Sequence, residues 1–91
     1  MNDMIAIRLQ LFGAIRHFFD HRELSIKLPI NSRVSDLRSH LKAISQNHAS
    51  HQKMQEVISS SVFADDRSVL KESDQINPKN SLAILPPVCG G

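Results

Sequence analysis

The residues with the clearest chemical potential are the last six of the 91-residue chain, Pro86-Pro87-Val88-Cys89-Gly90-Gly91. The sequence holds three glycines in all, and the final two residues are two of them. Proline lacks a backbone N–H, so paired prolines stop a strand and hold the following chain extended. Glycine has no side chain, so such a terminus fits a site too narrow for a Cβ atom. The pattern predicts that the Gly91 carboxylate is presented for activation, for instance by adenylation, and for transfer to a nucleophile.

A frayed terminus with accidental glycines is the simpler interpretation of the same residues. The proline stop, the spacing and the scarcity of glycine elsewhere favour a presented terminus. Six extended residues reach about 20 Å beyond the fold. We therefore expect a folded domain over residues 1–85 and an extended tail over residues 86–91.

Two segments near the start of the chain alternate apolar and polar residues, the period of half-buried strands. They cover residues 5–11 and 24–28, and Pro29 closes the second. Strands this close in sequence are expected to pair antiparallel. Gly13 breaks the first strand, and residues 14–19 are expected to form a helical turn with Ile15 and two phenylalanines facing the core.

A longer segment changes to a spacing of three or four residues, which predicts an amphipathic helix over residues 34–45, lying across the sheet. Asn31 or Ser32 is expected to cap its N-terminus, and Asp36 suits the positive end of its dipole. The expected core-facing residues of this helix are Val34, Leu37, Leu41 and Ile44.

The remaining elements are shorter. They are a polar loop or exposed helix at 46–53, a helical turn around Met54, Val57 and Ile58, a strand at 62–64, a turn at Asp65-Asp66, a brief edge strand at 69–70, a turn at 78–80 and a last strand at 81–85. On pattern alone, this order of elements indicates a small α+β domain.

The string Leu85-Pro86-Pro87-Val88-Cys89-Gly90-Gly91 resembles the C-terminal signature of the small, sulfur-carrying subunit of molybdopterin synthase. Phe12-Gly13-Ala14-Ile15-Arg16 is similar to the aromatic-small-x-hydrophobic-Arg stretch of that family, and Phe63-Ala64 is similar to its Ala-Val segment. Two turns depart from the family pattern, at Asp65-Asp66-Arg67 and at Lys79-Asn80. The resemblance implies a ubiquitin-like β-grasp fold, with a mixed sheet of four to five strands packed on one main helix.

The resemblance also implies a mechanism. An E1-like adenylating enzyme would activate the Gly91 carboxylate with ATP, and sulfur from a persulfide would displace AMP to leave a thiocarboxylate. The tail would then enter the large subunit of molybdopterin synthase, in a heterotetramer, and give its sulfur to a pterin precursor of the molybdenum cofactor. The catalytic side chains are expected on the large subunit. The present chain is expected to bind no cofactor or metal, and residues 86–90 would give Gly91 access.

Phe12 and Leu85 are the candidate partner-binding residues. Alternation in the first and last strands places both on the outer face of the sheet. Isolated exposed apolar residues are ordinary. Two of them near the tail form the kind of apolar patch that marks an interface. Members of the resembled family dock partners through this face, which favours the binding role.

Cysteine and histidine offer weaker signals. A thiol at Cys89, two residues from a thiocarboxylate, could accept sulfur, although a tolerated small residue is the simpler interpretation. His17 and His21 are spaced i,i+4, and His48 and His51 are spaced i,i+3, as metal ligands on a helix can be. Neither pair has a further cysteine or carboxylate to complete a recognisable set, so solvated surface histidines are favoured.

Composition excludes several other classes. A single cysteine allows no intrachain disulfide and suits a reducing, cytoplasmic setting. A net charge of +2, with scattered basic residues, is too weak to predict nucleic-acid binding. Apolar runs fall short of the roughly 18 residues of a membrane span, so we expect neither a nucleic-acid nor a membrane partner.

Three other functions are compatible with the sequence. The chain could carry sulfur for thiamine, cysteine or another metabolite, although Pro86-Pro87 argues against the thiamine pathway. It could be a ubiquitin-like modifier that joins Gly91 to lysines of other proteins. It could also be a binding module with an inert tail, in which case removal of Gly90-Gly91 changes nothing.

Overall fold

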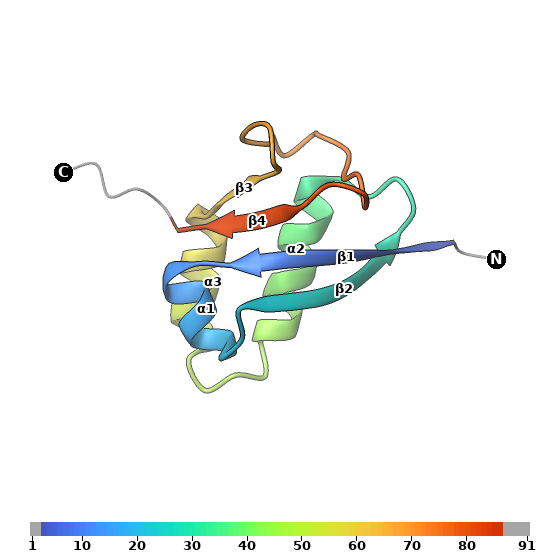
Figure 1. Cartoon of the computed structure of the whole chain (residues 1–91). Coiled ribbons are helices and arrows are strands. Elements are labelled where there is room, and N and C mark those ends of the chain that lie inside the picture. The colour runs from blue at the N-terminus through green and yellow to red at the C-terminus, as the bar shows by residue number, and fades with distance from the viewer. Residues whose placement is uncertain (1–2, 87–91) are drawn as a thin grey trace.

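The computed structural model describes residues 3–86, in which a four-stranded sheet is covered on one face by helices (Figure 1). In chain order the elements are β1 (Met4–Leu11), α1 (Gly13–Phe19), β2 (Glu23–Pro29), α2 (Val34–Ser45), α3 (His51–Ser60), β3 (Val62–Ala64) and β4 (Leu82–Leu85). The expected α+β class and the expected bounds of α2 are confirmed.

The order of strands across the sheet is β2-β1-β4-β3. β1 pairs antiparallel with β2, as predicted, and parallel with β4, while β3 pairs antiparallel with β4. The sheet therefore contains both parallel and antiparallel pairs. β1 and β4 lie side by side in the centre of the sheet. Because the two strands are parallel, β4 ends next to the C-terminal end of β1.

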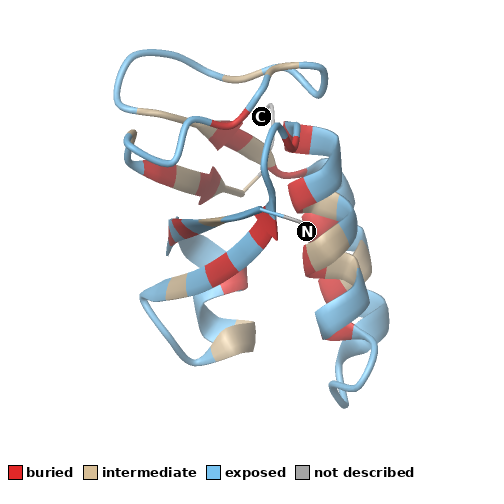
Figure 2. Ribbon diagram, turned by 90° about the vertical axis from the view of Figure 1, so that its right-hand side faces the viewer, coloured by how far each residue is buried: buried red, intermediate tan, exposed pale blue. Residues whose placement is uncertain are grey.

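The core lies between the sheet and the helices. Alternate strand residues, among them Ile7, Leu9 and Ile84, are buried, and so is one stripe of each helix. Figure 2 shows these buried positions of strands and helices facing one another. Each fully buried aliphatic side chain of this kind stabilises the fold by about 1.5–3 kcal/mol relative to exposure. No helix of residues 3–86 packs on the opposite face, which we call the open face of the sheet (Figure 1).

Two expectations for α2 are wrong. Its N-terminus is not capped by Asn31 or Ser32, because Asn31 is left-handed (φ 68°) and the Ser32 hydroxyl donates to the Pro29 carbonyl at 2.6 Å. The Asp36 carboxylate instead accepts the Arg33 N–H at 2.8 Å, at the positive end of the helix as expected.

Ile44 was expected in the core but is 42% exposed, whereas Ser45 is fully buried. Ser45 lies four positions after Leu41, so it continues the buried stripe of the helix, and the Ile44 side chain points away from that stripe. The buried Ser45 hydroxyl donates to the Lys42 carbonyl and accepts from the Gln55 amide, both at 2.8 Å. Those bonds explain how a polar residue occupies a core position.

The second half of the chain follows the prediction with two changes. The helical turn around Met54 is a full helix, α3, in which Met54 and Ile58 are buried. The edge strand at 69–70 is absent from the described residues, which show a single bridge between Ala64 and Val69. The Asp65 side chain accepts the N–H groups of Arg67 and Ser68 and so closes the turn between the two residues of this bridge.

Arg38 joins three segments of the fold. Its side chain is 16% exposed. It donates to the carbonyls of Ile58 and Ser61, at 2.9 Å for the latter, and pairs with the Glu72 carboxylate. The guanidinium lies 5.0 Å from the centre of the Phe63 ring. Because the last carbonyls of a helix have no partner within it, Arg38 satisfies the end of α3.

Across residues 3–86, no helix has the length and apolar character needed to cross a bilayer.

Candidate functional site

The root of the tail lies at the end of the two central strands. β4 ends at Leu85, and Pro86 is the last residue that the structure describes. The five predicted site residues beyond it, Pro87, Val88, Cys89, Gly90 and Gly91, lie outside the described residues. The structure therefore describes the part of the domain at which the tail begins.

Pro86 packs directly against Gly13. A Cβ atom built on Gly13 would lie 2.8 Å from Cγ and 3.2 Å from Cβ of the proline ring. Gly13 also has a left-handed backbone (φ +61°), which glycine adopts without steric cost. The Gly13 position in the sequence was predicted only as a strand break, and its contact with Pro86 could not be read from the sequence.

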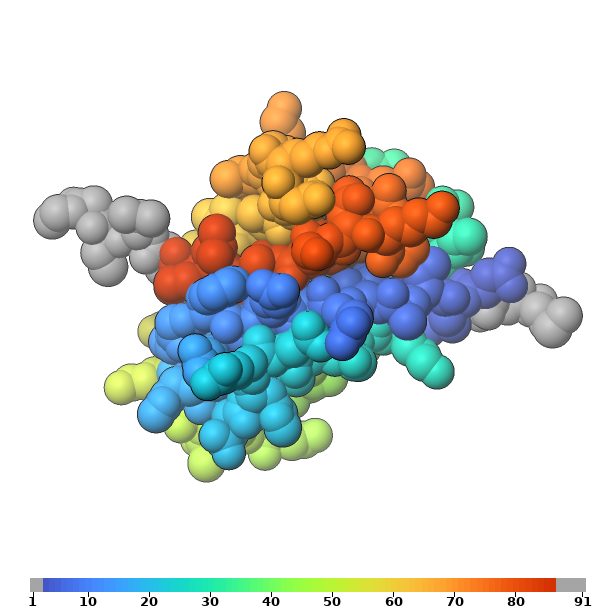
Figure 3. Space-filling model, viewed as in Figure 1, coloured from blue at the N-terminus to red at the C-terminus, as the bar shows by residue number. Residues whose placement is uncertain are grey.

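Phe12 and Leu85 lie at the same end of the open sheet face. Phe12 follows β1 with extended backbone (φ −129°, ψ 156°), so the alternation of the strand continues through it, and its side chain is 42% exposed. Leu85 is half-buried and alternates with the buried Ile84. Figure 3 shows the ends of β1 and β4 side by side on this face. Their exposure on this face agrees with the sequence, and partner binding by Phe12 and Leu85 stays a prediction.

Val62 is a further residue of this surface that the sequence analysis missed. It is the direct antiparallel partner of Leu85, and it is half-buried. Residues directly opposite in a sheet present their side chains on the same face. Alternation with the buried Phe63 could have placed Val62 on the outer face, but its pairing with Leu85 depends on the register. We call Phe12, Val62 and Leu85 the tail-side patch.

Two arginines border the tail-side patch. Arg16 and Arg22 both line a hollow of about 600 Å³ beside Gly13 and a second of about 260 Å³ beside Phe12. The Arg22 carbonyl accepts the Leu11 N–H at 2.8 Å, which fixes this segment against β1. Among residues 3–86 neither guanidinium forms an ion pair, since the pairs found are Arg8–Glu23 and Arg38–Glu72. Each hollow is also lined by one carboxylate, Asp20 in the first and Glu23 in the second.

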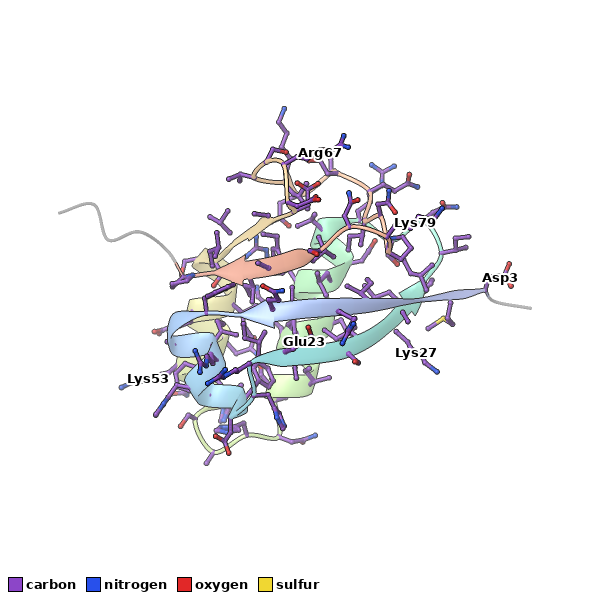
Figure 4. The ribbon with its side chains drawn as sticks, in the orientation of Figure 1. Asp3, Glu23, Lys27, Lys53, Arg67 and Lys79 are labelled. Carbon is purple, nitrogen blue, oxygen red and sulfur yellow. The ribbon has the colours of Figure 1, made fainter. Side chains whose placement is uncertain are left out.

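Other charged groups lie farther away. Figure 4 shows Arg67 and Lys79 on the segment between β3 and β4, away from α1. In the turn after β3, the N–H groups of Arg67 and Ser68 donate to Asp65 and hold the pKa of its carboxyl below the ordinary value of 3.8. These bonds shape a turn, so the lowered pKa has a structural cause.

The histidines do not assemble a metal site in the described part of the chain. His17 and His21 both line the larger hollow, with Asp20 between them in sequence. His48 accepts the Ser50 N–H on Nδ1 at 3.0 Å, within the loop before α3. Over residues 3–86 no group of three or more histidine, cysteine, aspartate or glutamate side chains is placed to hold a metal ion.

Sequence comparison identifies one family. Residues 9–91 match the sequence profile of the ThiS family. The match therefore includes the tail. Comparison with curated protein sequences gives no significant match.

Three solved structures are similar to this chain over nearly their whole length. A candidate molybdopterin converting factor subunit 1 from Pyrococcus furiosus has a TM-score of 0.72 at 20% identity, and covers 92% of this chain and 99% of its own. SAMP1 from Haloferax volcanii has a TM-score of 0.60 at 14% identity, with 94% and 99% covered. The small archaeal modifier protein 1 from Methanosarcina acetivorans has a TM-score of 0.55 at 19% identity, with 98% and 99% covered. These likenesses confirm the β-grasp fold.

Proposed function

The chain belongs to the ThiS family of ubiquitin-like sulfur carriers, and we propose that it carries sulfur as a thiocarboxylate on Gly91 for molybdopterin synthase. The observation that carries the proposal is the placement of β4. This strand lies in the centre of the sheet beside β1, and Pro86, the residue that follows it, packs against Gly13. Pro86 is therefore the described residue at which the tail begins.

The proposed chemistry takes place on the terminal carboxylate. A carboxylate oxygen attacks the α-phosphorus of ATP, pyrophosphate leaves, and an acyl adenylate forms. The terminal sulfur of a protein persulfide then attacks the carbonyl carbon and AMP leaves. The product is an acyl disulfide that links Gly91 to the donor protein. A second thiol attacks the donor's sulfur and cleaves the S–S bond, which yields a protein disulfide and releases the thiocarboxylate. An E1-like adenylating enzyme, the usual partner of this family, supplies the catalytic side chains and uses the ATP.

The roles of the tail residues follow from the chemistry. Gly91 carries the reacting group, and Gly90 allows the backbone into a narrow site. Pro86 and Pro87 limit the conformations available to the tail, which lowers the entropy lost when it enters a partner. Val88 and Cys89 lie between the prolines and the glycines. The proposed transfer does not require the Cys89 thiol.

The choice of molybdopterin synthase rests on the Pro-Pro-Val-Cys-Gly-Gly tail. The large subunit of that enzyme, in a heterotetramer, is the proposed acceptor of the tail and the carrier of the catalytic groups that act on the pterin. Similarity to the P. furiosus structure supports the same fold without deciding the pathway, because identity is only 20%.

Reconstitution tests the pathway. The thiocarboxylated chain is mixed with a molybdopterin synthase large subunit and the pterin precursor, and the dithiolene product is measured after oxidation to a fluorescent pterin. Product formation that depends on the thiocarboxylate supports the proposal. If no dithiolene product forms with the cognate large subunit and sulfur is transferred to another metabolite, the chain acts in a different sulfur pathway.

A ubiquitin-like modifier is the second candidate, since two of the similar structures are small archaeal modifier proteins. In that function a lysine amine attacks the acyl adenylate and forms an isopeptide bond. Affinity purification of the tagged chain under denaturing conditions distinguishes the two. Isopeptide-linked Gly91 on other proteins would favour the modifier, and a terminus found only free or as thiocarboxylate would favour the carrier.

A further inference from the structure

We propose that Gly13 is a positioning residue for the tail, because it leaves the space in which the Pro86 ring sits and so sets the direction in which the chain leaves β4. The inference rests on the proposed function only in its purpose, which is the delivery of Gly91. The contact itself is between two described residues.

The space beside Gly13 admits no side chain. An added Cβ would meet three atoms of the Pro86 ring, at 2.8 Å (Cγ), 3.2 Å (Cβ) and 3.4 Å (Cδ). A Cβ contact of 2.8 Å is closer than carbon atoms approach in folded proteins. The ring therefore occupies volume that any residue other than glycine would fill.

Gly13 is itself fixed to the core. It follows Phe12 at the start of α1, and Ile15, two residues later, is fully buried. On the other side Leu11 pairs with Ile84. The backbone of Gly13 is thus held between β1 and the buried first turn of α1.

Pro86 needs such a packing contact. It has no N–H, so a sheet hydrogen bond from its own nitrogen cannot hold it. Its φ angle is fixed by the ring, so the packing of that ring also orients the outgoing backbone. Small errors in this direction grow along a tail that reaches about 20 Å. Misplacing a reacting group by 1 Å costs up to about 100-fold in rate.

Gly13→Ala introduces two effects that a double-mutant cycle separates. Alanine is strained at a φ of +61°, and this strain does not depend on residue 86. The contacts with Cγ and Cδ depend on the proline ring and disappear when Pro86 is replaced by alanine, whereas the 3.2 Å contact with Cβ remains. We compare four proteins: the wild type, Gly13→Ala, Pro86→Ala and the double variant.

The direction of the tail is measured with a nitroxide attached to Cys89, the single cysteine of the chain. The label broadens amide signals near it, so the pattern of broadening over the domain reports where the tail points. We expect Gly13→Ala to shift the strongest broadening to a different set of amides. In the Pro86→Ala background the same substitution should cause a much smaller further shift, because the contacts with Cγ and Cδ are gone.

Equal shifts in both backgrounds, or an unchanged pattern in Gly13→Ala, would overturn the proposal. If Gly13→Ala does not fold but the double variant does, the ring contact is responsible, and the proposal stands. If neither Gly13→Ala nor the double variant folds, the broadening pattern of Pro86→Ala alone tests the proposal, because this substitution removes the ring without introducing strain at Gly13. An unchanged pattern there contradicts the proposed contact.

Adenylation by the E1-like enzyme gives a second readout. We expect Gly13→Ala to lower kcat/KM by about 10- to 100-fold, with a much smaller effect in the Pro86→Ala background. A wild-type chain that shows the labelled-tail pattern but is never adenylated would contradict the proposed function and leave the positioning of Pro86 intact. The two failures are therefore distinguishable.

Discussion

Leu11 and Ile84 are direct neighbours in the parallel pairing of β1 with β4, although they lie near opposite ends of the chain. Both side chains are buried against the helices. Because side chains alternate across a strand, the next residues, Phe12 and Leu85, face the open side of the sheet. The tail-side patch thus lies at the end of the sheet where Pro86 follows β4, and we expect a partner that takes up the tail to contact the patch as well.

Leu85→Glu is expected to weaken binding to the adenylating enzyme by about tenfold or more, because it buries a charge in an apolar contact. Titration calorimetry with the purified partner measures the change in Kd. The half-buried position of Leu85 on the open face means that the substitution does not enter the core.

Ile30→Glu is the matched control for this prediction. Ile30 is 54% exposed and adjoins Pro29, which pairs with Met4 at the other end of β1. We expect this variant to bind like the wild type. Similar losses in both variants would show a nonspecific effect of charge, and an unchanged Kd for Leu85→Glu would remove Leu85 from the interface.

Arg38→Lys is expected to lower the free energy of unfolding by about 1–3 kcal/mol. A lysine ammonium cannot reproduce the planar fork that reaches the carbonyls of α3 and the Glu72 carboxylate together. Urea unfolding followed by circular dichroism measures the loss.

The exposed Arg67 provides the comparison, since Arg67→Lys is expected to change the free energy of unfolding by less than about 0.5 kcal/mol. The turn uses the Arg67 N–H, which this substitution preserves. Equal stability of Arg38→Lys and wild type would show that the Arg38 cluster contributes no stability beyond what a lysine supplies.

Asp65 makes stability depend on pH. Backbone N–H groups of Arg67 and Ser68 lower its pKa in the folded state, so its contribution is fully present above the ordinary value of 3.8. The contribution is lost as pH falls from 3.8 through the lowered folded-state pKa. The wild type should therefore be more stable than Asp65→Asn at pH 7, and this difference should shrink in acid.

Urea unfolding of both proteins between neutral and strongly acidic pH checks this dependence. Asp66→Asn serves as the control, because the Asp66 side chain accepts no such backbone hydrogen bonds among the described residues. A stability difference between wild type and Asp65→Asn that stays constant across this range would contradict the assignment.

Much of the fold was predictable from local patterns. The period of two over β1 and β2, and the period of three to four over α2, predicted these elements and the antiparallel pair. Ile44 shows where a local pattern is insufficient. A stripe at helical spacing accommodates either Ile44 or Ser45, and only the packing of Gln55 from α3 against Ser45 decides between them.

The part of the domain at which the tail begins was less predictable, because it depends on contacts between distant segments. The tail motif and the outward position of Leu85 could be inferred from the sequence. The pairing of Val62 with Leu85 and the packing of Pro86 on Gly13 follow from the register of β3, β4 and β1. Register between strands far apart in sequence leaves no local signal.

Deletion of Gly91 is expected to abolish sulfur transfer while changing the free energy of unfolding by less than about 0.5 kcal/mol. Among the described residues the buried core extends from Ile7 to Ile84, so the truncated chain should keep its fold. Circular dichroism and urea unfolding establish the fold, and product formation with the large subunit establishes activity. Wild-type activity in the truncated protein would contradict a terminal sulfur donor.

The most direct test of the central claim is the intact mass of the chain after incubation with ATP, the adenylating enzyme and a persulfide donor. Replacement of one oxygen by sulfur adds about 16 Da, whereas a persulfide on the Cys89 thiol adds about 32 Da. We predict the smaller gain, located at Gly91 by fragmentation. Formation of AMP with no gain at Gly91, or a gain confined to Cys89, would contradict the assignment of this chain as a thiocarboxylate sulfur carrier.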